Sequence, residues 1–307
     1  MFAGIYQILH TPFTDAGEID WESLGAQIDF CLKAGVHGLV TPMMASEFFA
    51  LSDAERTEVV EYTLSAVNRR VPVLIGVQGL TERIALAFAE HAAAHGADGL
   101  LAMPPYLRKA STPGVESYFR QLAQLGLPLM IQNAPAPVGS PLSPRALADL
   151  LRDEPTIEYI KEETPPILQR ITQIRELAGD ACKGVFGGAN GLFLPEELAR
   201  GACGNMPAGG VVDIQVRIYD RYMAGDRAGA EALHFRLLPL LIHAQTHGVT
   251  FHKWLLWRRG VLASSHARDP QQLPLDEHDK RTIEQRWQLV ADEALADYPL
   301  FGQGERP

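Results

Sequence analysis

The chain has 307 residues, of which 47% are hydrophobic and 21% are charged, and this composition is typical of a soluble globular protein. The formal net charge is -10 and no basic run occurs, which argues against nucleic acid or an anionic membrane as a partner. Cys31, Cys182 and Cys203 lie far apart, which favours a reducing compartment over a disulfide framework or a structural zinc site. Because the first residues lack a basic segment and a long apolar stretch, we expect a cytoplasmic protein without a membrane span.

From the N-terminus, short apolar segments with strand character alternate with helical segments. The apolar segments are residues 5–9, 38–41, 71–77, 99–103, 127–131, 157–161, 182–186 and 203–206. Helix starts between them carry capping signals, such as Ser52 with Glu55 three positions later and Ser143 before a proline. Strands that alternate with helices form parallel sheets, and eight such units close a (β/α)8 TIM barrel. An open doubly wound sheet is the alternative, which is disfavoured because no GxGxxG motif follows the first strand.

The strand pattern stops at about residue 224, and the remaining chain is predicted to be helical. We therefore expect a barrel over residues 1–224 and a C-terminal helical extension over residues 225–307 that packs on the barrel. In the first helix of this extension, His243 and His247 have the four-residue spacing that places two metal ligands on one helix face. No glutamate stands in the HExxH register, so we expect this face to be solvated.

A lysine stands at the end of the sixth predicted strand. Ile157, Tyr159 and Lys161 alternate along that strand, so their side chains point to the same side of the sheet. Active sites of (β/α)8 barrels lie at the carboxyl ends of the strands, which is where Lys161 falls. Burial disfavours the charged ammonium and makes the neutral amine available as a nucleophile. We therefore predict that Lys161 forms a Schiff base with a 2-keto acid; the alternative is a surface lysine at a strand end.

Metal or phosphate chemistry is another alternative for a barrel enzyme. Glu47, Glu162 and Glu163 stand at predicted strand ends, but their spacing along the sequence is not typical of a metal site. We therefore expect no metal and no cofactor. The pairs Gly187-Gly188 and Gly209-Gly210 follow the last two strands, where barrel loops often bind phosphate. Ordinary turns explain these glycines equally well, so the phosphate alternative stays open.

Several short motifs occur along the chain in a definite order. They are Thr11-Pro12-Phe13, Glu47 with Leu51-Ser52-Asp53-Ala54-Glu55-Arg56, Met103-Pro104-Pro105-Tyr106, Gln132-Asn133-Ala134-Pro135 and Ile160-Lys161-Glu162. Taken together, they resemble the dihydrodipicolinate synthase / N-acetylneuraminate lyase family over the whole barrel and, more weakly, over the helical tail. The resemblance implies a (β/α)8 barrel with a C-terminal helical extension, a class I Schiff-base mechanism without metal, and a homo-oligomer, either a dimer or a tetramer. Lys161 falls on the family's Schiff-base lysine.

Three departures from the family pattern concern its substrate site. The family's GTTGE loop, whose threonines bind the keto-acid carboxylate, reads Met43-Met44-Ala45-Ser46-Glu47 here. Gln132 replaces the tyrosine that relays protons, and an amide cannot carry a proton near neutral pH. The arginine that binds a second carboxylate has no equivalent around Val138-Gly139. We therefore do not expect the synthase activity of the lysine pathway.

The loop from Gln132 to Pro135 and the segment from Ser46 to Arg56 look more like the L-2-keto-3-deoxyarabonate dehydratase branch of the family. This resemblance implies a lyase that forms an imine at C2 of a 2-keto-3-deoxy sugar acid, removes a C3 proton and expels the C4 hydroxyl. Retro-aldol cleavage of a 2-keto-3-deoxy or 4-hydroxy-2-keto acid to pyruvate and an aldehyde is the alternative. A keto-acid-binding protein with decayed catalysis is the alternative of another class, and the intact Lys161 argues against it.

Roles for the remaining residues follow from this mechanism. Lys161 is the predicted nucleophile, and the candidates for carrying the proton are Glu47, Glu163 and, third, Tyr106. Backbone N–H groups in the altered loop are expected to bind the substrate carboxylate. The predicted substrate-contacting residues are Ala45, Ser46, Gln132, Asn133, Glu163 and Met206.

Overall fold

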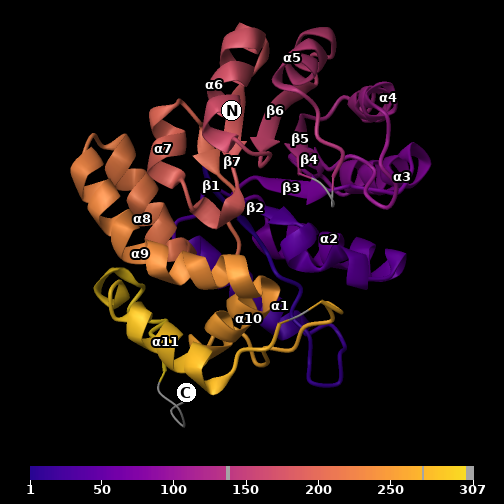
Figure 1. The fold of residues 1–307 in the computed structure, drawn as a ribbon. Helices are drawn as coiled ribbons and strands as arrows, with labels where there is room; N and C mark the ends of the chain where they lie inside the picture. Colours follow the sequence, from indigo (N-terminus) through magenta and orange to yellow (C-terminus); the bar gives the residue numbers. More distant parts are fainter. Residues whose placement is uncertain (136–138, 272, 302–307) are drawn as a thin grey trace.

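The computed structural model describes residues 1–135, 139–271 and 273–301, and a closed barrel of parallel strands forms its centre (Figure 1). Neighbouring strands pair in chain order, and β8 closes the barrel by pairing with β1. The strands are β1 (Gly4–Ile8), β2 (Gly38–Thr41), β3 (Val73–Gly76), β4 (Gly99–Ala102), β5 (Leu129–Asn133), β6 (Ile157–Glu162), β7 (Gly184–Gly187) and β8 (Gly204–Asn205). The predicted (β/α)8 barrel is confirmed.

Helices alternate with the strands and surround the barrel (Figure 1). They are α1 (Trp21–Lys33), α2 (Asp53–Val67), α3 (Glu82–Ala94), α4 (Thr112–Ala123), α5 (Pro144–Asp153), α6 (Ile167–Ala178), α7 (Leu194–Ala199) and α8 (Val212–Met223). The C-terminal helices are α9 (Arg227–His247), α10 (Val249–Arg258) and α11 (Glu277–Trp287). Short 3-10 helices are η1 (Met44–Ser46), η2 (Phe48–Ala50), η3 (Gly179–Ala181), η4 (Ala189–Gly191) and η5 (Ala291–Glu293).

The C-terminal helices form a layer beside the second half of the barrel. Helix α9 packs against α7 and α8, and both α10 and α11 pack against α9 (Figure 1). Within the described ranges, no helix is long and apolar enough to cross a membrane. The cytoplasmic location and the homo-oligomeric state stay predictions.

Local sequence signals set several helix boundaries. At the start of α2, Ser52 Oγ accepts a hydrogen bond from Glu55 N, and the Glu55 side chain accepts one from Ser52 N at 2.8 Å. This arrangement is the capping box that the sequence predicts. Ser143 caps α5 by accepting from Ala146 N, and proline occupies the first position of that helix.

Strand alternation divides the buried side chains into two cores. One core fills the space between strands and helices, and a smaller core fills the barrel interior. On β6, Ile160 belongs to the outer core and Tyr159 to the inner one. Lys161 follows the same alternation and therefore faces the interior, as does Gln132, its partner in register on β5. The period of the strands thus places a lysine and an amide side by side at the mouth of the barrel.

A buried ion pair ties the C-terminal layer to the barrel. Arg259, which directly follows α10, is fully buried and donates to both carboxylate oxygens of Asp213 on α8, at 2.9 and 2.6 Å. Arg259 also donates to Tyr298 O at 2.8 Å, and Asp213 accepts from Leu295 N at 2.8 Å. Because both charges are compensated by several hydrogen bonds, removal of one partner leaves the other charge buried and unpaired.

We expect Asp213→Ala to lower the free energy of unfolding by about 3–5 kcal/mol, because the Arg259 guanidinium stays buried without its counter-ion. Urea unfolding followed by circular dichroism measures the change. Arg145→Ala is the matched control, since Arg145 and Asp149 form an exposed pair at 3.4 Å. Loss of an exposed pair costs about 1 kcal/mol or less, so equal losses in the two variants would contradict the structural role of Asp213.

Candidate active site

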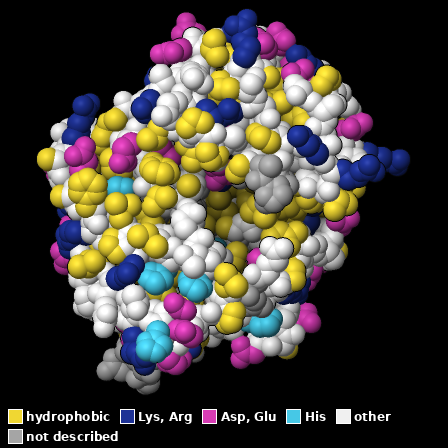
Figure 2. All heavy atoms as spheres, in the orientation of Figure 1, with side chains coloured by type: hydrophobic (Ala, Val, Ile, Leu, Met, Phe, Trp, Pro, Cys, Tyr) yellow, Lys and Arg dark blue, Asp and Glu magenta, His cyan; other side chains and the backbone are white. Residues whose placement is uncertain are grey.

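A cavity of about 400 Å³ lies at the carboxyl ends of the strands. Its lining residues come from the strand ends, η1, η4 and α9, and most are apolar, including Met43, Met103 and Met206. The face drawn in Figure 2 is hollowed near its centre, where hydrophobic side chains gather. The polar side chains that line the cavity are Gln132, Lys161, Glu163, Asn190 and Gln245.

The predicted nucleophile lies in this cavity. Lys161 is 2% exposed, and its Nζ lies 3.3 Å from Glu163 Oε1. The same Glu163 oxygen accepts from Ala189 N at 3.2 Å, while the other oxygen accepts from Gln132 Nε2 at 2.5 Å. Gln132 Oε1 is buried and has no hydrogen-bond partner among the described residues, so it can accept from a substrate hydroxyl. The structure therefore brings a buried amine, a carboxylate and an amide together.

Glu163 is held in its ionised form. Burial raises the pKa of this carboxyl, but the Lys161 ammonium and the hydrogen bonds from Gln132 and Ala189 outweigh burial, so the pKa lies below the usual value. A carboxylate that stays ionised at neutral pH and lies beside the amine can accept a proton from it. Glu163, one of the candidate proton carriers predicted from the sequence, thus lies where it can accept a proton from Lys161.

Two glycines at the carboxyl end of β7, Gly187 and Gly188, leave room for carboxyl groups. A Cβ atom on Gly188 would lie 2.2 Å from Glu163 Oε1, and one on Gly187 would lie 1.9 Å from Glu197 Oε2. Both positions therefore exclude any side chain. Because two carboxyl groups already occupy the adjacent space, close packing explains this glycine pair better than phosphate binding does.

Glu197 was not singled out by the sequence, although it lies close to the site. It projects from α7, is fully buried, and accepts a hydrogen bond from Asn205 Nδ2 at 2.7 Å. Burial raises the pKa of Glu197 to about 8, the Asn205 bond opposes this rise, and the negative charge of Glu163 adds to it. Glu197 is thus protonated at neutral pH, whereas Glu163 is ionised. Nothing in a run of helix-forming residues could indicate that this glutamate reaches back to the end of β7.

The predicted substrate-contacting residues divide into two groups. Ala45, Gln132, Glu163 and Met206 line the cavity, whereas Ser46 and Asn133 do not. Ser46 Oγ is buried and donates to Leu9 O at 2.5 Å, so its hydroxyl anchors η1. Asn133 lies on the outer side of β5, where its Nδ2 donates to the carboxylate of Glu162 at 2.9 Å. Strand alternation directs both Asn133 and Glu162 away from the barrel interior.

Glu47 is also placed outside the lining of the cavity. Its carboxylate is fully buried, forms an ion pair with Lys253 on α10, and accepts from Arg268 N and Asp269 N, both at 2.7 Å. Its backbone has a left-handed conformation with φ 55° at the junction of η1 and η2. The side chain therefore connects the loop that contains Ala45 to the C-terminal helices. This geometry is that of an anchor for the loop.

Lys253, the partner of Glu47, is equally buried. Its Nζ donates to His266 O at 3.0 Å and lies 4.2 Å from the centre of the Phe13 ring. Burial lowers the pKa of Lys253 to about 8, and the Glu47 carboxylate opposes that fall. The two residues therefore form a fully buried ion pair.

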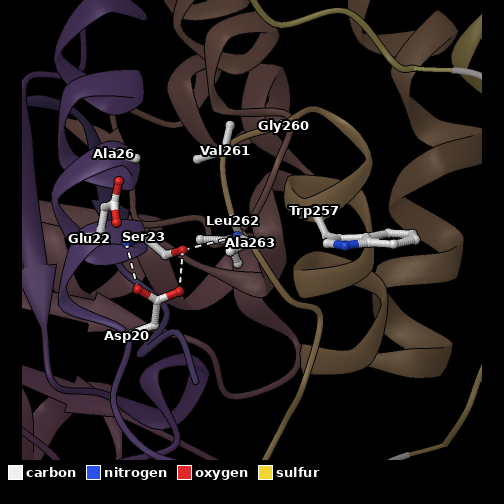
Figure 3. Close-up of a pocket in the computed structure, with 9 residues that line it drawn as sticks. All are labelled: Asp20, Glu22, Ser23, Ala26, Trp257, Gly260, Val261, Leu262 and Ala263. Carbon is white, nitrogen blue, oxygen red and sulfur yellow. Dashed lines mark hydrogen bonds between the residues drawn. The ribbon is translucent and has the colours of Figure 1, made fainter. Parts of the chain in front are cut away.

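A second cavity, of about 320 Å³, lies between the start of α1 and the loop after α10 (Figure 3). Two of its polar side chains serve local structure. Asp20 caps α1 by accepting from Ser23 N at 3.0 Å and from Ser23 Oγ at 2.6 Å, and Ser23 Oγ accepts from Ala263 N at 3.0 Å. These bonds, drawn in Figure 3, join α1 to the loop, and none of the described residues that line the cavity carries an amine or an imidazole. The Lys161 cavity is therefore the stronger candidate for chemistry.

Comparisons with known proteins identify the family of this chain. Residues 1–288 match the Dihydrodipicolinate synthetase family. The chain is 33% identical over 272 residues to L-2-keto-3-deoxyarabonate dehydratase of Azospirillum brasilense, covering 87% of this chain and 88% of that protein. It is 34% identical over 291 residues to 4-hydroxy-tetrahydrodipicolinate synthase of Methanoculleus marisnigri, and this match covers 93% of this chain and 97% of that protein. It is 31% identical over 292 residues to the putative 2-dehydro-3-deoxy-D-gluconate aldolase YagE of Escherichia coli, covering 92% and 95%.

Solved structures show the same fold. Dihydrodipicolinate synthase from Rhodopseudomonas palustris superposes with a TM-score of 0.87 at 27% identity, covering 94% of this chain and 97% of that one. YagE of Escherichia coli, solved in complex with pyruvate, superposes with a TM-score of 0.86 at 29% identity. This match covers 94% of this chain and 99% of that one. A (β/α)8 barrel with a buried lysine at its mouth thus defines the class of protein. The chain belongs to the dihydrodipicolinate synthetase family and is a lyase of that family.

We expect Lys253→Met to lower the free energy of unfolding by about 3–5 kcal/mol, because the Glu47 carboxylate stays buried without its counter-ion. Adding Glu47→Gln removes that charge, so the double variant should recover part of the loss. Urea unfolding of the two single variants and the double variant completes the cycle. Strictly additive losses would show that the two residues are not coupled.

Proposed function

We propose that this protein is a Schiff-base-forming lyase that removes water from a 2-keto-3-deoxy sugar acid. The observation that carries the proposal is the buried Lys161 amine, 3.3 Å from the Glu163 carboxylate in a cavity at the strand ends. The similarity to a 2-keto-3-deoxyarabonate dehydratase and to a putative sugar-acid aldolase supports a keto-acid substrate. Lys161 and Glu163 act in sequence in this reaction.

The first step is imine formation. The Glu163 carboxylate accepts a proton from the Lys161 ammonium, and the neutral amine attacks the C2 carbonyl of the keto acid. Glu163 returns this proton to the hydroxyl of the carbinolamine, which leaves as water, so a protonated imine forms and Glu163 is again ionised. Backbone N–H groups around Ala45 bind the substrate carboxylate, since the threonine hydroxyls of the family are absent from this loop.

The second step is elimination across C3 and C4. The protonated imine withdraws electrons from C3, so Glu163 removes a C3 proton and an enamine forms. The enamine expels the C4 hydroxyl, which leaves as water after taking a proton from Glu163. Gln132 replaces the proton-carrying tyrosine of the family, and its amide orients a substrate hydroxyl without transferring a proton. Hydrolysis of the imine then releases the product and restores Lys161.

The cavity favours a substrate whose far end is neutral. Among the described residues that line the cavity, Lys161 is the one cation. The neutral polar side chains in the lining are the amides of Gln132, Asn190 and Gln245. Amides donate to and accept from hydroxyl groups, whereas a second carboxylate would lack a counter-ion and would lie near Glu163. A hydroxylated chain therefore fits this cavity better than a dicarboxylate does.

Retro-aldol cleavage is the second candidate, and the similarity to YagE favours it. The same protonated imine can break the C3–C4 bond when a base removes the proton of the C4 hydroxyl. Glu163 could serve that step from the same position. Analysis of the products separates the two reactions, because cleavage releases pyruvate and an aldehyde while dehydration keeps all carbon atoms in one product.

We expect borohydride treatment in the presence of pyruvate to attach a reduced adduct to Lys161, detected by mass spectrometry of the digested protein. Lys161→Arg should lose both the adduct and the turnover of 2-keto-3-deoxy sugar acids, because a guanidinium cannot form the imine. Lys183→Arg is the control, since that lysine lies one strand away, paired with Glu158 on the surface. An unaltered chain that forms no adduct with any keto acid would refute the proposal.

We expect Glu163→Gln to form the borohydride adduct more slowly but still to completion, and to slow exchange of the pyruvate methyl protons in D2O by about 10²–10⁴-fold, measured by proton NMR. Glu47→Gln is the comparison, because an anchor should leave exchange much less affected than a base does. The pKa of Glu163 lies below the usual glutamate value, so exchange should stay constant as the pH falls to about 5. If Glu47→Gln slowed the exchange and Glu163→Gln did not, Glu47 would be the base and Glu163 would not.

A further inference from the structure

Two histidines and an aspartate meet at the contact between α9 and α11. His243 and His247 lie four residues apart on α9, and Asp279 lies in the first turn of α11. One ring nitrogen of each histidine and one Asp279 carboxylate oxygen lie within 4.8 Å of one another. The His247 side chain is 11% exposed, so the face that the sequence predicted to be solvated is packed against α11 instead.

The two imidazole rings carry buried nitrogen atoms without partners. His243 Nε2 and His247 Nδ1 are buried and have no hydrogen-bond partner in the part of the chain that the structure describes. Buried polar atoms in folded proteins nearly always have a partner, and an ion or water is a common explanation where the protein offers none. His247 turns its other nitrogen, Nε2, toward Asp279, so the partnerless His243 Nε2 is the atom that points to a ligand at this contact.

The Asp279 carboxylate supplies the negative charge of the cluster, and imidazole nitrogens bind metal ions through their lone pairs. Arg286, which lies on α11 with Asp279, donates to Pro239 O at 2.9 Å.

The aspartate is already oriented toward the histidines. Asp279 Oδ2 accepts from Asp276 N at 3.1 Å in the capping box of α11. Asp279 Oδ1 then lies 3.7 Å from His247 Nε2. In a tetrahedral zinc site with bonds of about 2.1 Å, two ligand atoms lie about 3.4 Å apart. The separation of this pair is therefore close to that of two ligands of one ion.

We propose that His243, His247 and Asp279 bind one zinc ion that joins α9 to α11. Two imidazoles and a carboxylate are ligands that zinc prefers, and water completes the four-coordinate shell. Each protein ligand comes from a helix that is already packed in place, so only side-chain adjustments bring the three atoms to bonding distance.

The ion stabilises the helix that closes one side of the active-site cavity. Gln245 lies between the two histidines in the chain, points to the opposite face of α9, lines the cavity, and donates to Ala189 O at 3.2 Å. The zinc ion thus acts from the far side of α9 and takes no part in the chemistry at Lys161. Its role is to fix α9 against α11.

A second cluster, formed by Glu61, His91 and His95, has a simpler explanation. His91 Nε2 lies 2.9 Å from Glu61 Oε1, and His95 Nδ1 hydrogen-bonds to His91 O at 2.8 Å. The Glu61 side chain is 50% exposed, so water and direct pairing satisfy this group. This cluster therefore serves as the control for the proposed site.

The test begins with the whole chain, which is equilibrated with zinc, freed of unbound metal by gel filtration, and analysed by mass spectrometry for metal content. We expect one zinc ion per chain. The double variant His243→Ala/His247→Ala should retain none, and Asp279→Asn should bind more than about tenfold more weakly in competition with a zinc-binding dye. The control variant His91→Ala/His95→Ala should bind as the unaltered chain does.

Two further measurements keep the proposal open to refutation if the double variant does not fold. Cobalt(II) added to the unaltered chain should give the visible absorption bands of a four-coordinate site, and Asp279→Asn should change them. Zinc should raise the thermal midpoint of the unaltered chain and of the control variant. Absence of retained zinc, or retention that depends on His91 and His95, would refute the site. Either of these two refuting outcomes would leave the proposed imine formation at Lys161 unaffected.

Discussion

The active site depends on one buried ion pair, Lys161 with Glu163. An amine and a carboxylate in a mainly apolar cavity are stable only when each compensates the other, and this need fixes the surrounding groups. Gln132 and the backbone of Ala189 complete the hydrogen bonds of the carboxylate, and Gly188 is required because a side chain there would occupy the space of the carboxylate. In the proposed mechanism, Glu163 is both the counter-ion of Lys161 and the base that moves the proton.

Two more buried pairs connect the C-terminal helices to the barrel. Asp213 with Arg259 holds α8 to the segment after α10, and Glu47 with Lys253 holds the loop of η1 to α10. The extension therefore stabilises the wall of the cavity and also contributes Gln245 to its lining. These buried ion pairs therefore link the packing of the C-terminal helices to the position of the loop of η1.

Local patterns were sufficient to predict the barrel and its lysine. The alternation of apolar strands and capped helices specifies the parallel units, and the strand period places Lys161 on the inner face. The same rule explains why Asn133, one residue beyond Gln132, faces outward and contacts Glu162. Local patterns could not show that Glu47 would turn toward the C-terminal helices, because its partner Lys253 lies about 200 residues further along the chain.

The sequence by itself thus determined the (β/α)8 architecture and the lysine that we propose as the nucleophile, since both follow from periodicity and from residue type at a strand end. The tertiary structure decided which carboxyl groups surround that nucleophile and in which protonation state. Glu163 is ionised beside Lys161, whereas Glu197, which reaches the end of β7 from a helix, is protonated. Burial and the charges of neighbours set these states, and both quantities exist only once distant segments have packed together.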